Sequence, residues 1–162
     1  GFTAAVFHIM AHAVTKSQLF LTTPRLAAVS GNSLRFKNLQ GCALRDPNAG
    51  LFFLIPSLSM IGIPIFAGFS SKLFFAMAAA DRGGIKLILV MLVLAASSLL
   101  NALYFIRTLI RIYTQSDSAK EKVRHHLDYN IPMIALTLAN LAMGLFSGVF
   151  AALIGQGFGM FY

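Results

Sequence analysis

The chain has few acids, few charges of any kind and a single cysteine. Of its 162 residues, 11% are charged and 57% are hydrophobic, and a mean hydropathy of +0.76 is too high for a soluble domain. Cys42 is the single cysteine, which excludes a disulfide or a cysteine metal site within this chain. The acids all lie outside the apolar runs, at Asp46, Asp81, Asp117, Glu121 and Asp128. We therefore expect an integral membrane protein in contact with the lipid bilayer.

Sequence patterns of enzyme sites are also missing. The chain contains no nucleophile elbow, no glycine-rich phosphate loop and no carboxylate pair. His8 and His12 have the spacing of two zinc ligands on a helix, but the glutamate of an HExxH motif and a further ligand are absent. We therefore predict no chemical reaction, no metal and no dedicated cofactor.

Basic residues are in excess, and they fall mostly between the apolar runs. The chain has 13 Lys and Arg residues and a formal net charge of +8. Binding to nucleic acid would need these residues on one solvated face with aromatic residues among them, so we expect no nucleic-acid partner. The connectors 24–50 and 115–130 carry four and three basic residues. The positive-inside rule therefore places both on the cytoplasmic side or its organellar equivalent.

Four apolar segments, at about 1–23, 48–80, 85–114 and 131–154, predict an all-α membrane bundle with four transmembrane segments. Together they would form a single transmembrane domain over residues 1–162. The first segment is expected to end before Pro24. The small and polar residues near the middle of the third, including Ser98, indicate helix packing rather than an ion site. The fourth is the most regular, and its GxxxG pair, Gly144 and Gly148, predicts a close helix contact.

The second segment is too long and too interrupted to be one straight helix. From Pro47 to Ala80 a helix would be about 51 Å long, against about 30 Å of bilayer hydrocarbon. Pro64 has no amide hydrogen, and Gly62 and Gly68 tolerate backbone angles that other residues resist, so they predict two half-helices around an unwound link at roughly 62–68. Lys72 would lie beside this break, facing the bundle interior or an ion path. The alternatives are a lysine that snorkels to the interface or a buried hairpin in a soluble protein.

The first segment carries one polar stripe. His8, His12 and Lys16 are spaced i, i+4 and i+8, so they share one face of a helix. Burial without a counter-charge favours the neutral form of an amine, which would let Lys16 and Lys72 exchange protons. A ladder of His, His and Lys joined by water is a hypothesis for a proton path. The alternative is that the histidines only hydrogen-bond neighbouring helices and that Lys16 snorkels.

Three stretches resemble one family. HIMAHAVTKSQLFL resembles the HxxxHxxxKxxLFL helix of the antiporter-like membrane subunits of respiratory complex I, Mrp-type cation/proton antiporters and membrane-bound hydrogenases. The string GIPIFAGFSSK, with the connector before it, resembles the next segment of that family. ALYFIRTLIRIY resembles the aromatic and arginine-containing end of the following helix. The resemblance covers nearly the whole chain, although LFLTTP departs from the family's LFLxxG.

This resemblance implies the C-terminal part of a larger subunit that translocates protons or exchanges monovalent cations for them. Lys72 would be the terminal lysine on the second broken helix, and His8, His12 and Lys16 would form the connecting relay. The partners would be other membrane subunits, in a bacterial or archaeal cytoplasmic membrane or the mitochondrial inner membrane. The family's first repeat is absent, so we expect a fragment or one piece of a split subunit. A stand-alone transporter of a small solute and a non-conducting structural subunit remain as alternatives.

Overall fold

The computed structural model describes residues 1–33, 35–115 and 127–159, and these form helices and connecting loops without a strand. The all-α fold expected from the sequence is confirmed. The helices are α1 (Phe2–Val29), α2 (Cys42–Arg45), α3 (Pro47–Ile61), α4 (Ala67–Ala80), α5 (Gly84–Tyr113), α6 (Leu127–Leu145) and α7 (Ser147–Gly159).

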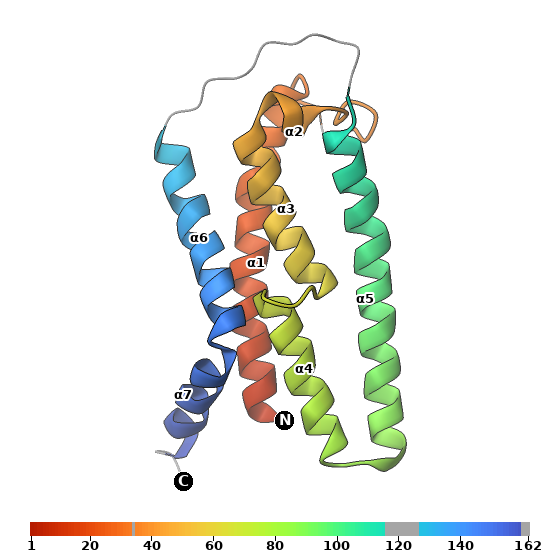
Figure 1. Cartoon of the computed structure of the whole chain (residues 1–162), viewed down its shortest axis with the longest axis vertical. Helices are drawn as coiled ribbons and strands as arrows, with labels where there is room; N and C mark the ends of the chain where they lie inside the picture. The colour runs from red at the N-terminus through yellow and green to blue at the C-terminus, as the bar shows by residue number, and fades with distance from the viewer. Residues whose placement is uncertain (34, 116–126, 160–162) are drawn as a thin grey trace.

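Helix α1 is the centre of the bundle. It packs against α3, α4, α6 and α7, whereas α5 packs against α3 and α4 on the outside (Figure 1). Helices α3 and α4 follow one another along α1, and the link between them lies about midway along it (Figure 1). One apolar cluster, which includes Leu26, Phe53 and Ile112, joins the helices at the α2 end, and a second, which includes Phe7, Ala67 and Met143, lies towards the other end. The link is therefore held from several sides.

One described helix, α5, is by itself both long and apolar enough to cross a membrane. Residues Tyr129–Leu145 and Ser147–Gly157 meet the same criterion only as a pair, with an 83° bend between them, and α3 and α4 are shorter apolar helices. The four separate spans that we expected are therefore not confirmed by length and composition. Lys120, Lys122 and Arg124, which contributed to the predicted orientation, lie outside the described residues.

The prediction that the first segment ends before Pro24 is wrong, because α1 continues through Pro24 to Val29. A proline costs a helix one backbone hydrogen bond and strains the preceding turn. Hydroxyls of that turn bond to helix carbonyls: Thr22 donates to Gln18 O at 2.7 Å and Thr23 donates to Leu19 O at 2.8 Å. The additional turn contains Arg25, which is therefore part of the helix and not of the connector.

The fourth segment, predicted as one span over about 131–154, is bent by 83° at a break between α6 and α7. A Cβ on Gly144 would overlap the backbone of Ile65 and Phe66, so this glycine allows α6 to touch the link between α3 and α4. The carbonyl of Gly144 also accepts a hydrogen bond of 3.2 Å from Ser70 Oγ of α4. Gly148 has nothing within 4 Å of the position of a Cβ. The close contact expected of the GxxxG pair is therefore made by Gly144 alone.

This difference predicts opposite outcomes for two matched substitutions. Gly144→Ala should destabilise the subunit by about 1–3 kcal/mol, the usual cost of overpacking, since backbone atoms cannot turn aside as a side chain can. Gly148→Ala should be neutral or slightly stabilising, because alanine favours a helix and space is open there. Thermal unfolding of the purified complete subunit measures both. Equal midpoints for the two variants would contradict this packing.

Candidate functional site

The site is built on the break between α3 and α4. Helix α3 ends at Ile61 and α4 begins at Ala67, so the link comprises residues 62–66 and includes Pro64, whereas Gly68 lies inside α4. Gly62 ends α3 in the left-handed region, at a φ of 99°. A Cβ on Gly68 would overlap the carbonyl of Ser59, so Gly68 allows α4 to start directly against α3. The link is therefore slightly shorter than the sequence predicted, and Gly68 serves close packing.

Buried side chains from two other elements satisfy the first amides of α4, whose N-cap residue makes no side-chain cap. The amide of Ala67 donates to Asn140 Oδ1 of α6 at 3.2 Å, and the amide of Gly68 donates to Ser59 Oγ of α3 at 3.1 Å. Asn140 Nδ2 also donates to Thr15 Oγ1 of α1 at 3.1 Å. Asn140 therefore joins α1 and α6 to the first residue of α4. The only sequence signal for this role was a polar residue in an apolar segment.

Lys72 turns its amine back to the end of α3. Its Nζ donates to Ile61 O at 2.8 Å, to Met60 O at 3.2 Å and to Ser98 Oγ of α5 at 2.7 Å. The carbonyls belong to the last turn of α3, where the helix dipole is negative and backbone acceptors lack partners in the helix. A Cβ at Gly62 would be 3.1 Å from Nζ, so glycine leaves the room that the amine needs. The two carbonyls at the end of α3 and the hydroxyl of Ser98 thus hold the amine. None of these three acceptors is a carboxylate.

A cavity of about 150 Å³ lies beside this amine. Its lining comes from α1, α3, α4 and α5, and most of its residues are polar: His8, Ala11, His12, Thr15, Ser59, Met60, Gly68, Ser71, Lys72, Ser97 and Asn101. The ring nitrogen Nδ1 of His8 is 2.6 Å from Ser71 Oγ, and the His8 and His12 rings are 5.6 Å apart. A polar cavity of this size has room for several water molecules. It can therefore join the imidazoles and the amine through water.

The structure brings His8, His12 and Lys72 to one cavity, but Lys16 does not line it. Lys16 is half-buried on α1 one turn beyond His12, and the imidazoles themselves remain partly exposed at the surface of the described residues. Lys16 thus continues the predicted stripe without contact to the cavity.

A second polar stripe on α1, which the sequence analysis did not separate from the first, is buried against α3 and α6. It consists of Thr15, Gln18, Thr22 and Arg25. Its hydroxyls donate to carbonyls of α1 itself, and Gln18 Nε2 donates to Thr137 Oγ1 of α6 at 2.7 Å. Because these hydroxyl hydrogens are already engaged, the second stripe holds helices together and is poorly suited to pass protons.

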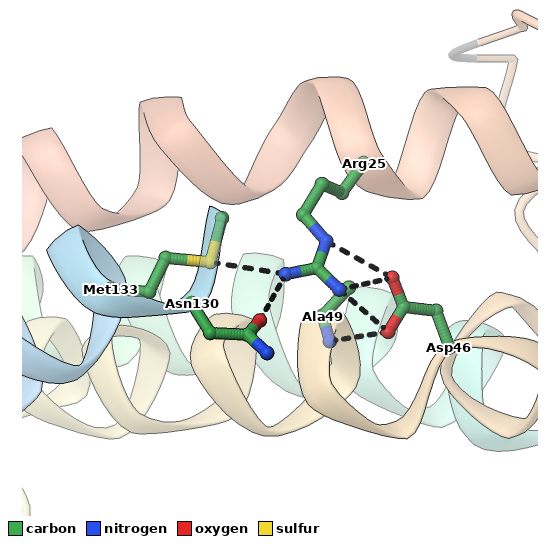
Figure 2. Close-up of polar contacts among 5 residues, drawn as sticks. All are labelled: Arg25, Asp46, Ala49, Asn130 and Met133. Carbon is green, nitrogen blue, oxygen red and sulfur yellow. Dashed lines mark hydrogen bonds and ion pairs between the residues drawn. The ribbon is translucent and has the colours of Figure 1, made fainter. Parts of the chain in front are cut away.

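The second stripe ends in a buried ion pair between Arg25 and Asp46 (Figure 2). Arg25 Nε and Nη2 each donate to the carboxylate at 3.1 Å, and Nη1 donates to Asn130 Oδ1 of α6 at 2.7 Å. Asp46 also accepts from the amide of Ala49 at 3.0 Å and so caps the N-terminus of α3. Arg25 is one of the four basic residues that the sequence analysis counted in connector 24–50. It is 6% exposed and joins α1 to α3 and α6.

Comparison with known proteins identifies the family. The family model described as "NADH:quinone oxidoreductase/Mrp antiporter, TM" matches residues 1–99, which include α1, the break and Lys72. The chain belongs to this family. The antiporter-like resemblance drawn from the sequence motifs is thereby confirmed, and so is the membrane nature of the chain as a member of the complex I and Mrp antiporter family.

The relatives of this chain include an Na(+)/H(+) antiporter subunit and subunits of NADH-quinone oxidoreductase. The chain is 44% identical over 72 residues to Na(+)/H(+) antiporter subunit A1 of Staphylococcus haemolyticus, which covers 44% of this chain and 9% of that protein. It is 30% identical over 158 residues to NADH-quinone oxidoreductase subunit N 1 of Solibacter usitatus, an alignment that covers 91% of this chain and 30% of that protein. It is 27% identical over 147 residues to NADH-quinone oxidoreductase subunit L of Buchnera aphidicola, an alignment that covers 90% of this chain and 23% of that protein. The chain thus spans less than a third of the length of these relatives.

Proposed function

We propose that this chain is the C-terminal part of a membrane subunit that translocates protons, or exchanges monovalent cations for protons, within a larger complex. The observation that carries the proposal is the polar cavity where His8, His12 and the amine of Lys72 meet beside a broken helix. A titratable amine at a break and two imidazoles, with room for water between them, are the parts that a proton path through a membrane needs. The relatives' printed names include both an Na(+)/H(+) antiporter subunit and NADH-quinone oxidoreductase subunits.

In this mechanism energy applied elsewhere in the complex changes the proton affinity of Lys72. The released proton passes to water in the cavity and then to the imidazoles of His8 and His12, each of which can accept at one ring nitrogen and release at the other. Lys16 would continue the path along the same face of α1. The partners would be other membrane subunits, and protons or monovalent cations would be the transported species.

The cavity favours an ion path over the transport of a small organic solute. Pockets for small molecules usually measure about 300–1,000 Å³. This one is about 150 Å³ and its lining includes two imidazoles, an amine, three serines and an asparagine. Water and protons fit there, and the volume is below the usual range of pockets for drug-sized ligands.

We further propose the orientation of the chain. The loops around α2 and the adjoining ends of α5 and α6 lie at one end of the bundle, and the turn between α4 and α5 lies at the other (Figure 1). Connectors 24–50 and 115–130 would face the cytoplasm or its organellar equivalent, in a bacterial or mitochondrial membrane. Arg25 no longer counts as a free charge in this argument, since it is paired with Asp46.

The relay is tested by removing its imidazoles. A complete complex with His8→Leu and His12→Leu together should transport protons at least about tenfold more slowly, because positioned acid–base groups commonly contribute that much or more. Proton movement into inverted membrane vesicles measures the rate. Ser17→Leu is the control, since it changes an exposed polar residue of the same helix outside the cavity. Wild-type transport by the double variant would rule out a histidine relay.

A further inference from the structure

The three groups that hold the amine of Lys72 differ in what they can do when the amine loses its proton. Met60 O and Ile61 O are backbone carbonyls, which only accept hydrogen bonds. Ser98 Oγ, at 2.7 Å, is a hydroxyl and can both accept and donate. An ammonium supplies three donors to these three acceptors, whereas a neutral amine has two donors and one lone pair. The neutral amine therefore needs one partner that donates, and among the three only Ser98 can.

The hydroxyl hydrogen of Ser98 is available for this purpose. Other helix hydroxyls, including those of Thr15, Thr108 and Thr137, donate to the carbonyl four residues earlier. Ser98 makes no such bond among the described residues, where its one side-chain hydrogen bond is to Lys72. Its hydroxyl can therefore rotate without breaking a bond to the backbone.

We propose that Ser98 is a working residue of the site, which accepts a hydrogen bond from the ammonium of Lys72 and donates one to the neutral amine. The inference rests on the proposed function, since it assumes that Lys72 changes protonation state. In the step, the ammonium rotates one N–H from its acceptor to a water in the cavity, that N–H bond breaks, and the proton goes to the water. The neutral amine then turns its lone pair to Ser98. The Ser98 hydroxyl then turns its hydrogen to the nitrogen lone pair. Ser98 neither gains nor loses a proton, and Lys72 keeps its place in both states.

The described residues that line the adjoining cavity include no acid. The titratable groups that line the adjoining cavity are His8 and His12, both from α1. Helix α3 contributes Ser59 and Met60 to this lining, and α5 contributes Ser97 and Asn101, so neither adds an acid or a second cation. Ser98 is outside the lining and contacts the amine from α5. It was interpreted from the sequence as a packing residue, and its contact with Lys72 is what changes that interpretation.

The test compares substitutions of Ser98 in the complete complex. Ser98→Ala, which can neither accept nor donate, should slow proton transport about tenfold and move its pH optimum by about half a unit or more, the effect of one hydrogen bond on a protonation equilibrium. Ser98→Thr keeps the hydroxyl and should stay within about twofold of wild type. Thr108→Ala removes another hydroxyl from α5, about 15 Å along the helix, and should leave rate and optimum unchanged.

The outcomes separate this inference from the proposed function. If Ser98→Ala transports normally with an unmoved pH optimum while Lys72→Met is inactive, the role of Ser98 is wrong and the function of Lys72 stands. If Lys72→Met itself transports normally, the proposed function fails as well. Loss of transport in Ser98→Ala and Ser98→Thr alike, with no change in the pH optimum of the residual activity, would indicate packing and overturn the inference. Native gels of each complex establish that assembly is equal.

Discussion

A complete complex with Lys72→Met should lose proton transport by at least about a hundredfold, because a positioned group that takes up and releases protons commonly contributes that much. Methionine has nearly the length of lysine and is apolar, so it can occupy the same space beside the break. It cannot carry a proton, and it leaves Met60 O, Ile61 O and Ser98 Oγ without the amine. The expected defect is therefore chemical rather than a failure to fold. Proton uptake by inverted vesicles, normalised to the amount of assembled complex, measures it.

The matched control for this variant is Lys86→Met. Lys86 lies exposed near the start of α5 and makes no hydrogen bond or ion pair among the described residues. The Lys86→Met variant loses the same charge and gains the same side chain as the Lys72→Met variant. Transport should stay near wild type in Lys86→Met. A Lys72→Met complex that pumps at the control's rate would show that the amine at the break has no part in transport.

The helices and the break could be predicted because their signals are local. Apolar runs of the right length predict helices, and Gly62 and Pro64 in one such run predict its interruption. Lys72 follows the break by about two turns of helix, so its position beside the break was predictable as well. What it contacts was not, since Ser98 comes from another helix 26 residues further along the chain.

The features that were predicted wrongly depend on partners that are distant in the sequence. Pro24 did not end α1, and the turn after it carries a buried ion pair. Arg25 pairs with an aspartate 21 residues away, and Asn140 bonds with Thr15 across 125 residues. A count of charges treats every arginine between apolar runs alike. Only the packing of α1 against α3 and α6 distinguishes the arginine that is paired from those that are exposed.

The cavity likewise could be predicted only in part. The i, i+4 spacing places His8 and His12 on one face, and both line the cavity with Lys72. Lys16 has the same spacing, yet it lies outside the lining, whereas Thr15, its neighbour in the chain, lies within it. Helical periodicity specifies which residues share a face. It does not specify which of them a cavity between helices reaches.

The largest effect on stability is expected from Arg25→Met. The substitution leaves the carboxylate of Asp46 buried at 0% exposure without its arginine, and removal of one partner from a buried ion pair costs about 3–5 kcal/mol. The amide of Asn130 loses its bond to Arg25 at the same time. The contacts between α1 and the first turns of α3 and α6 should therefore weaken together. Denaturant unfolding of the purified complete subunit measures the loss.

A second substitution separates the buried charge from the lost packing. Asp46→Asn in the Arg25→Met background removes the charge that Arg25 balanced, and its side-chain oxygen can still accept from the amide of Ala49 to cap α3. Because replacing both partners of a buried ion pair is often close to neutral, the double variant should regain most of the lost stability. Arg35→Met, at an exposed arginine whose side chain makes no hydrogen bond among the described residues, should change the unfolding free energy by less than about 0.5 kcal/mol. If Arg25→Met were as harmless as this control, the contacts of Arg25 could not be what holds α1 to α3 and α6.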